Sequence, residues 1–341
     1  MRIRVGIIGL GDDWDRWRRP ALKALSDRFE VRAVCAEVAA KAAHAGRGFG
    51  ASVTHGYRAL LARKDIDAVL LLAPQWYGPL PIYAACDHGK DVYCATAVDI
   101  DPDECLMLRR RVDAAGITFM SEFPRRVAPA TLRLKELIAT CLGQPRLLFC
   151  HRRLALEDGA DSPRHGACAS PRRELLETID WLRYLVGSDP TSVTSVRQQV
   201  WPGERSDDYR MMSLDFSPAH CPGAAALAQL SCGHYLPKTW PEAITFRPPA
   251  ALHVVCERGA AFLDLPATLV WFDEAGRHVE SLDHERPVGE LLLAHFYRAV
   301  TSLVRKPSGI DDACRALGIL AAADQSAAEG RRISLEEASA V

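Results

Sequence analysis

The chain has 341 residues, and 48% of them are hydrophobic, so it can bury enough apolar surface for two domains. Its 42 basic and 43 acidic residues give a formal net charge of −1, which excludes a strong overall field that would attract nucleic acid or an anionic membrane. The apolar run from Val5 to Leu10 is too short for a signal-peptide core, and no other segment resembles a membrane span. We therefore expect a cytoplasmic protein with local, specific binding sites and no nucleic-acid or membrane partner.

The eleven cysteines are spread from Cys35 to Cys314 and contain no C-x-x-C pair. This distribution favours buried thiols in a reducing compartment over a disulfide framework or a zinc site. We expect a structural role for each cysteine and no metal site.

Strand-like and helix-like segments alternate from the start of the chain to Met120. Apolar strands are predicted at 3–8, 31–36, 67–73, 91–94 and 117–120, and amphipathic helices at 20–29, 39–45, 57–63, 80–88 and 102–115. Apolar strands that alternate with helices form a parallel sheet covered on both faces. Residues 1–120 are therefore predicted to form a doubly wound, Rossmann-type domain of the dinucleotide-binding kind.

The pattern changes after Phe123. A helix at 129–139 and a strand at 146–151 precede a polar loop at 157–171, and the segment RELLETIDWLRYLVG predicts a further helix. Short strands with turn signals fill residues 192–281, including a hairpin turn at Arg258-Gly259, and helices are predicted at 290–304 and 311–328. Residues 121–341 are therefore predicted to form an α/β domain on an open, mainly antiparallel sheet.

The segment from Val5 to Trp14 begins like a dinucleotide-binding loop. Gly9 and Gly11 follow a buried strand, as required for a tight turn that approaches a pyrophosphate closely. Trp14 then occupies the position where a small residue lets helix and strand pack, and Asp12 and Asp13 place negative charge where the anion would lie. The fold signal is therefore stronger than the cofactor signal.

Several segments, in this order and spacing, resemble the glucose-fructose oxidoreductase, inositol dehydrogenase and MocA (Gfo/Idh/MocA) family. They are VGIIGLG, PALKAL, VRAVC, DAVLLLAPQ, IYAACDHGKDVYC, FPRRVAPATLRLKELI, IDWLRYLVG and IDDACRALGILAAADQSAAEGRRISL. The resemblance implies a Rossmann domain, a second domain with an open antiparallel sheet, NAD or NADP as cofactor, and a sugar-like or polyol ligand. It also implies a homo-oligomer that pairs through the open sheet face.

The family's catalytic positions carry other residues in this chain. The lysine of the family's Glu-Lys-Pro corresponds to Thr96, and the histidine of its Asp-x-Gly-x-His-x-x-Asp corresponds to Glu177, while Asp180 keeps the last acid. Thr96, Glu177 and Asp180 are therefore the candidate catalytic residues. Thr96 can donate a hydrogen bond but cannot act as a base, whereas Glu177 is either a base with a raised pKa or an ion-paired helix acid.

The resemblance also points to the cofactor positions. Gly9 and Gly11 form the turn, Glu37 is the nearest substitute for the acid that binds the ribose, and Pro74 and Gln75 stand in the loop after the fourth strand. These five residues are the candidate cofactor-binding residues.

Other residues near these positions have two interpretations each. The pair Trp76-Tyr77 either stacks on a ligand or fills the cofactor space, and His151 or His165 either replaces the missing imidazole or is structural. The arginines of the first helix, Arg16, Arg18 and Arg19, either offset Asp12 and Asp13 or form a solvated face.

Two functional hypotheses follow. Simultaneous departures at the turn, the ribose acid, the lysine and the histidine favour a degraded cofactor and catalytic site, and hence a non-catalytic binding or assembly module. The alternative is an active NAD(P)-dependent oxidoreductase on a sugar, polyol or related carbonyl compound, with a non-standard proton relay. These residues alone leave open whether the chain is an enzyme, which substrate it takes, and whether NAD or NADP binds.

Overall fold

The computed structural model describes residues 2–11, 13–95, 100–156, 171–200, 209–218, 220–237, 239–240, 242–243, 246, 248–302 and 309–335. The chain forms two compact units, Met1–Pro124 with Arg286–Leu317, and Arg125–Glu285 with Gly318–Val341. Residues 286–317 thus belong to the first unit although they follow the second unit's sheet in sequence. The contiguous division after residue 120 stays a prediction.

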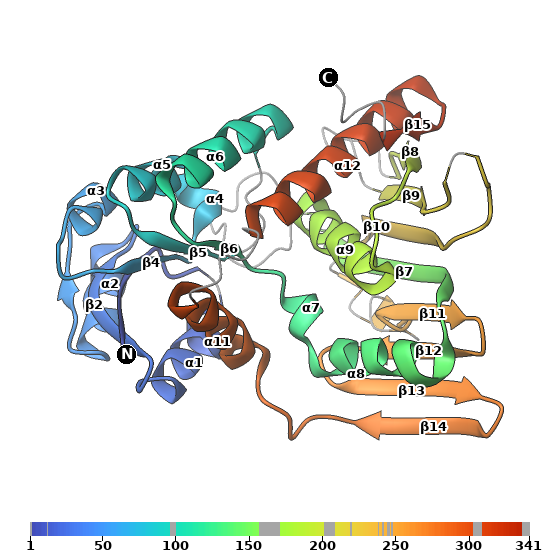
Figure 1. Cartoon of the computed structure of the whole chain (residues 1–341), viewed down its shortest axis with the longest axis horizontal. Helices are drawn as coiled ribbons and strands as arrows, with labels where there is room; N and C mark the ends of the chain where they lie inside the picture. The colour runs from blue at the N-terminus through green and yellow to red at the C-terminus, as the bar shows by residue number, and fades with distance from the viewer. Residues whose placement is uncertain are drawn as a thin grey trace. The chain divides into compact units, whose positions relative to one another are not determined.

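The first unit is built on a parallel sheet, which we call sheet A, with the order β3-β2-β1-β4-β5-β6 among the described residues (Figure 1). Its strands are β1 (Ile3–Ile8), β2 (Phe29–Cys35), β3 (Ser52–Val53), β4 (Ala68–Leu71), β5 (Asp91–Cys94) and β6 (Phe119–Ser121). The predicted doubly wound sheet is confirmed. The order reverses between β1 and β4, which is where ligands bind in such sheets.

The first unit also contains helices from two parts of the chain. They are η1 (Trp14–Arg18), α1 (Arg19–Ala24), α2 (Ala39–Arg47), α3 (Tyr57–Leu61), α4 (Pro74–Tyr77), α5 (Leu80–Asp87), α6 (Pro102–Ala115), α11 (Val288–Thr301) and the start of α12 (Gly309–Glu329). Figure 1 shows α5 and α6 on one side of the sheet and α1 and α11 on the other. Phe29 of β2 and Tyr93 of β5 both contact Phe296 of α11, so this late helix completes the core of the first unit.

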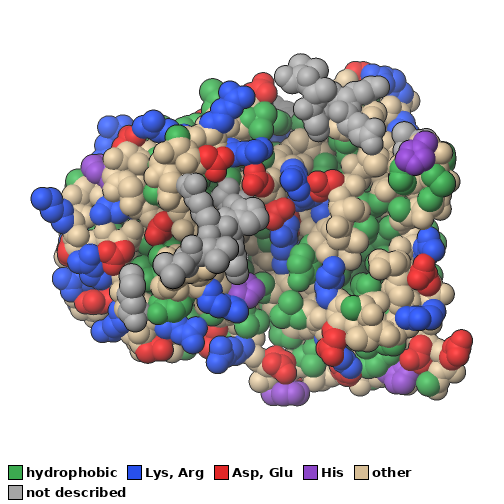
Figure 2. Space-filling view, in the orientation of Figure 1, with side chains coloured by type: hydrophobic (Ala, Val, Ile, Leu, Met, Phe, Trp, Pro, Cys, Tyr) green, Lys and Arg blue, Asp and Glu red, His purple; other side chains and the backbone are tan. Residues whose placement is uncertain are grey.

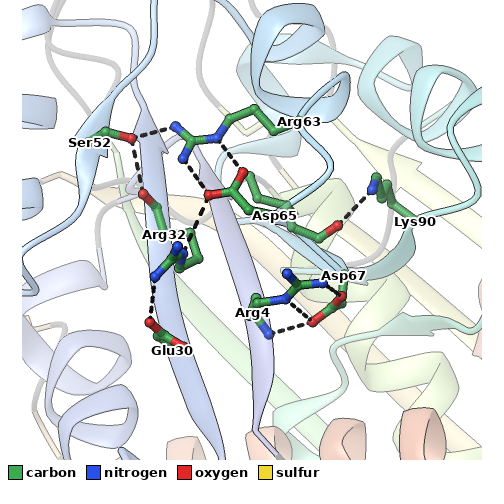
Figure 3. A network of polar contacts seen from close by, with 9 residues as sticks. Arg4, Glu30, Arg32, Ser52, Arg63, Asp65, Asp67 and Lys90 are labelled. Atoms are coloured by element: carbon green, nitrogen blue, oxygen red, sulfur yellow. Dashed lines mark hydrogen bonds and ion pairs between the residues drawn. The ribbon is translucent and has the colours of Figure 1, made fainter.

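A polar network ties the strands of sheet A together at their amino ends (Figure 3). Asp67, at the start of β4, accepts hydrogen bonds from the Arg4 backbone N–H at 2.9 Å and from Arg4 Nε at 3.0 Å. Asp65 accepts from Arg63 and from Arg32 of β2. These bonds cross-link β1, β2 and the approach to β4, at the opposite edge of the sheet from the strand ends that face a ligand.

The second unit is built on a mixed sheet, sheet B, with the order β14-β13-β12-β11-β7-β10-β9-β8-β15 among the described residues. Its strands are β7 (Pro145–Leu156), β8 (Ser192–Gln198), β9 (Tyr209–Asp215), β10 (Leu227–Pro237), β11 (Leu252–Cys256), β12 (Gly259–Asp264), β13 (Thr268–Asp273), β14 (Gly276–Ser281) and β15 (Ile333–Ser334). The predicted, mainly antiparallel sheet is confirmed, although the central pair β7 and β10 runs parallel. The predicted hairpin turn lies one residue earlier, because Cys256 pairs with Gly259.

Helices α7 (Pro124–Val127), α8 (Pro129–Leu137), η2 (Ile138–Leu142) and α9 (Pro171–Val186) belong with sheet B. Helix α9 contacts β7 and β10, and α8 contacts β12 and β13. The apolar stripe that α9 buries consists of Leu175, Leu176, Ile179, Trp181, Leu182 and Leu185. Helix α9 therefore has a fixed orientation on the sheet, and its charged residues are placed with it.

The other face of sheet B carries a row of rings. Phe149, His253, Phe262 and Phe272 come from β7, β11, β12 and β13, and neighbouring ring centroids lie 5.3, 4.3 and 6.1 Å apart. Phe149 and Phe272 are exposed large apolar side chains. This is the open face that the sequence predicts.

One expectation about the cysteines is wrong. Cys105 of α6 and Cys314 of α12 form a disulfide within the first unit, with their Cα atoms 5.6 Å apart. The residues are 209 positions apart in sequence, so spacing gave no indication that the fold brings them together. The other described cysteines are free thiols, and most are buried.

The described helices include none that is long and apolar enough to cross a membrane. Within the same residues, no group of three or more His, Cys, Asp or Glu side chains is arranged to hold a metal ion. Basic and acidic side chains are interspersed on the face shown in Figure 2.

Candidate dinucleotide and ligand sites

The turn after β1 has the geometry of a dinucleotide-binding turn. Gly9 and Gly11 have φ values of 71° and 64°, a region that favours glycine. A Cβ atom on Gly9 would lie 2.5 Å from Ala73 Cβ, and one on Gly11 would lie 2.4 Å from the Leu72 carbonyl oxygen. Glycine is therefore required at both positions, and the turn lies against the end of β4, at the point where the strand order reverses.

The candidate cofactor residues come together at this edge of sheet A. Glu37 Oε1 lies 3.0 Å from the position of a Cβ atom on Gly9, and the Glu37 side chain is exposed. Pro74 begins α4 directly after Ala73, and Gln75 follows it with an exposed side chain. The structure thus places a carboxylate beside the turn, where a ribose hydroxyl is bound in dinucleotide sites.

Trp14 is accommodated by a change in helix type. The segment after the turn is a π-helix, in which the Asp13 carbonyl accepts from both Trp17 N–H at 3.2 Å and Arg18 N–H at 3.4 Å. Trp14 is buried, with its ring centroid 6.0 Å from that of Phe49. The wide helical turn gives the indole room without closing the glycine turn. Asp12 lies outside the described residues.

Tyr77 of α4 lies beside the same edge of the sheet. Its hydroxyl lies near the Cys35 thiol at the end of β2, and its ring packs edge-on against Tyr57 with ring centroids 6.1 Å apart. Burial, together with Cys35 and Glu37, raises the pKa of Tyr77, so the phenol remains protonated near neutral pH. Trp76 is 67% exposed, so its ring is accessible for stacking.

A buried charged cluster lies near the turn, and the sequence reasoning missed it. Arg18 is 5% exposed, and its Nη2 atom lies 3.4 Å from Glu122 Oε1. The Tyr93 hydroxyl donates to Glu122 Oε2 at 2.8 Å. Burial alone would lower the pKa of Arg18, but Glu122, Tyr93 and Asp13 raise it overall, so the guanidinium stays charged. Since Arg18 and Glu122 are 104 residues apart, no local pattern indicated the pair.

Glu177 is held by two arginines in the second unit. Arg173 Nε donates to its Oε1 atom at 3.0 Å, and Arg125 Nε lies 3.9 Å from its Oε2 atom. The Glu177 side chain is only 12% exposed. Both carboxylate oxygens therefore face guanidinium groups. The geometry is that of the ion-paired helix acid.

Glu174 forms the centre of a second ion-pair cluster that sequence reasoning missed. It accepts from Arg125 of α7 and from Arg152 of β7, the latter at 2.6 Å. Arg125 also donates to Thr178 Oγ1 at 2.5 Å. Burial raises the pKa of Glu174, but the two arginines lower it below its usual value overall. The first turns of α9 are thus anchored to α7 and β7 by charge.

Asp180 is fully buried in ion pairs. Arg126 Nε donates to its Oδ2 atom at 2.6 Å, and Arg183 Nη1 lies 3.5 Å from its Oδ1 atom. These contacts give Asp180 a structural role in joining α7 to α9. A catalytic role for Asp180 stays a prediction.

His151, the described candidate for the missing imidazole, does not lie beside α9. His151 lies on β7 with its Nδ1 atom 2.6 Å from Ser231 Oγ and its Nε2 atom 2.7 Å from the Tyr235 hydroxyl. It alternates along the strand with the buried Cys150, and so lies on the same face as the exposed Phe149, away from α9. Thr96 and His165 lie outside the described residues.

A doubly wound sheet with a glycine turn at its reversal point, and a second unit on a mixed sheet, define an α/β protein with a Rossmann-type unit. Residues 3–123 match the family described as "Oxidoreductase family, NAD-binding Rossmann fold", which supports membership of the Gfo/Idh/MocA family. This confirms the resemblance carried by the sequence segments.

Named relatives fit this assignment. The chain is 31% identical over 160 residues to D-xylose 1-dehydrogenase (NADP(+)) 2 of Haloferax volcanii, covering 47% of this chain and 49% of the relative. It is 29% identical over 204 residues to inositol 2-dehydrogenase 3 of Saccharopolyspora erythraea, covering 58% and 57%. These matches thus span about half the length of the curated relatives. A levoglucosan dehydrogenase structure in complex with NADH and levoglucosan superposes with a TM-score of 0.81 at 19% identity, covering 98% of this chain and all of that one.

Proposed function

We propose that this chain binds NAD(H) through the carboxyl edge of sheet A. The support is the glycine turn, whose two positive φ values and close contacts with the end of β4 are those of a tight turn that approaches a pyrophosphate in dinucleotide sites. Gly9, Gly11, Glu37, Pro74 and Gln75 would hold the cofactor. The bound nicotinamide would supply or accept a hydride.

The preferred form is NAD(H) rather than NADP(H). The exposed Glu37 carboxylate beside Gly9 can accept hydrogen bonds from the ribose hydroxyls, and it would repel a 2′-phosphate. The Haloferax relative is named for NADP(+), so this preference is a property proposed for this chain alone.

The second unit is proposed to bind a sugar-like or polyol ligand without oxidising it through the family's lysine and histidine. The observation that carries this proposal is Glu177, which stands at the histidine position and is held between Arg173 and Arg125. Oxidation of an alcohol requires a group that takes the hydroxyl proton and a positive charge that stabilises the alkoxide. Neither Thr96 nor an ion-paired Glu177 provides both. The chain then acts as a binding or assembly module.

An active oxidoreductase with a non-standard proton relay is the second candidate. The glycine turn supports this candidate as much as the first, because both require a bound cofactor.

We further propose that the chain forms a homo-oligomer through the open face of sheet B. The exposed apolar residues Leu147, Phe149, Val196, Leu227, Phe272 and Val279 all lie on strands of this sheet. An apolar sheet face of this kind requires a cover in water.

Two measurements on the wild-type chain separate these candidates. Fluorescence titration with NADH and NADPH tests cofactor binding and is independent of the substrate. Absorbance at the reduced-cofactor band, with a panel of aldoses, inositols and keto-sugars, tests turnover. Binding without turnover supports the module, and turnover of any member of the panel supports the enzyme. The absence of binding would contradict the proposed cofactor site.

A further inference from the structure

Arg18 lies directly behind the glycine turn. Its Nη1 atom is 3.1 Å from the position that a Cβ atom on Gly11 would occupy. The guanidinium also packs on the Trp17 ring, 4.7 Å from its centroid. A cofactor phosphate in contact with the Gly11 backbone would therefore lie within a few ångströms of a fixed positive charge.

The polar contacts of Arg18 leave one of its buried nitrogens without a partner among the described residues. Nη2 pairs with Glu122 at 3.4 Å, and Glu122 is held in turn by the Tyr93 hydroxyl. Arg18 Nε is buried and has no hydrogen-bond partner among the described residues. A buried hydrogen-bond donor without a partner lowers the stability of the fold. Such a donor is retained most readily where the charged group that carries it has another role.

The space around Arg18 is too small for a ligand. A cavity of about 10 Å³ is lined by Trp17, Arg18, Leu72, Tyr93 and Gly289 among others. Such a volume holds about one water molecule. Arg18 would therefore act on a cofactor at the turn through its electric field, and it does not form a separate pocket.

Without Arg18, the carboxylates near the turn would disfavour the binding of a pyrophosphate. Asp13 and Glu122 both raise the pKa of Arg18, so both carboxylates lie within reach of its charge. Without the positive charge of Arg18, a pyrophosphate bound at the turn would be repelled by these two carboxylates. In the low-dielectric interior, one charge a few ångströms away is worth a large factor in affinity.

We propose that Arg18 is a positioning residue for the pyrophosphate of the dinucleotide, held behind the glycine turn by Glu122 and Tyr93. The inference rests on the proposed NAD(H) site. The loop from Gly9 to Asp13 contains two acidic residues and no basic residue, so the positive charge comes from Arg18 of η1.

The test measures binding of NADH, ADP-ribose and adenosine to the full chain. The variant Arg18→Met is expected to weaken the binding of NADH and of ADP-ribose by about tenfold. The affinity for adenosine, which has no phosphate, is expected to change by less than about twofold. Arg18→Lys, which keeps the charge, is expected to retain most of the affinity. Equal losses for all three ligands would show a purely structural role and overturn the proposal.

Loss of Arg18 removes the positive charge beside the buried Glu122 carboxylate, so a second variant guards against unfolding. The double variant Arg18→Met with Glu122→Gln removes both charges and is expected to fold. Its affinities for NADH and ADP-ribose are expected to be at least about threefold weaker than those of the wild type. Its matched control is Arg19→Met with Asp15→Asn, which removes an exposed pair from the same region and should leave binding unchanged. A folded double variant that binds NADH as the wild type does would refute the role of Arg18 alone. A wild type that binds no NADH would refute the cofactor site as well.

Discussion

Arg126 of α7 donates through two guanidinium nitrogens to the two carboxylate oxygens of Asp180, which has no exposed surface. A bidentate pair of this kind fixes both partners in distance and in plane. Helix α7 is thereby fixed on α9, next to the turn of α9 that carries Glu177.

The variant Asp180→Asn is expected to lower the free energy of unfolding by about 3 kcal/mol, because it leaves Arg126 and Arg183 without their shared buried carboxylate. Urea unfolding monitored by circular dichroism measures the change. The control Asp189→Asn removes the exposed partner of Arg183 and should cost less than about 1 kcal/mol. Equal losses in the two variants would contradict the anchoring role.

The ion pairs of Glu174 predict how the free energy of unfolding depends on pH in acid. Its pKa in the folded state lies below the ordinary value of 4.5, so its contribution is fully present above that pH and is lost as the pH falls through the folded-state pKa. The stability difference between wild type and Glu174→Gln should therefore be constant from about pH 6 to 8 and shrink below about pH 4.5. Unfolding curves at several pH values test this, with exposed Glu136→Gln as control. A difference that grows in acid would contradict it.

Glu37→Arg is expected to shift the cofactor preference. Replacing the carboxylate beside Gly9 by a guanidinium should strengthen NADPH relative to NADH by about tenfold or more, since attraction replaces repulsion of the 2′-phosphate. Titration of both reduced cofactors gives the ratio. Asp27→Arg makes the same charge change before β2, at the amino edge of the sheet, and should leave the ratio as it is. An unchanged ratio in Glu37→Arg would exclude Glu37 from the ribose site.

Single repair of the catalytic positions is expected to fail. Thr96→Lys alone should give no detectable cofactor-dependent oxidation of sugars or polyols, because lysine, proton donor and cofactor loop act as a unit. Glu177→Gln in the wild type should change stability or ligand affinity rather than rate. If the chain is an active enzyme instead, wild type turns over a substrate and Glu177→Gln depresses that rate about a hundredfold. The same absorbance assay on all three proteins distinguishes the two outcomes.

The ring row on sheet B predicts the effect of charge on assembly. Phe149→Glu should shift the light-scattering mass toward the monomer, because a carboxylate on the apolar face opposes its burial in an interface. Leu132→Glu places the same charge on α8 at a side chain of similar exposure and should not change the mass. A strictly monomeric wild type at micromolar concentration would exclude this assembly.

Local patterns predicted much of the fold because local chemistry determines those elements. Helix α6 begins and ends where predicted, since Asp101 caps its first turn and Gly116 ends it in the left-handed conformation. Strands β1 and β5 also match their predicted bounds. By contrast, the parallel pairing of β7 and β10 joins segments about eighty residues apart, and pairing partners at such a separation carry no periodic signal.

The candidate sites were only partly predictable for the same reason. The glycine turn and Glu37 could be found from a short motif and the strand that follows it. The partners that decide what these residues do are distant in sequence, as with Arg18 and Glu122, or Arg125 and Glu177. The π-helix that accommodates Trp14 differs from an α-helix by one residue in a single turn, and so leaves no periodicity to detect.

The disulfide between Cys105 and Cys314 closes a covalent ring around everything between them in sequence. All the strands of sheet B except β15 lie inside this ring, while the glycine turn lies outside it. A single backbone cut anywhere within the ring leaves both fragments joined, so a nicked chain runs at full mass without reductant and as two pieces with it. Residues 125–285, which are most of the second unit, thus lie within the ring together with β6 and α11 of the first unit.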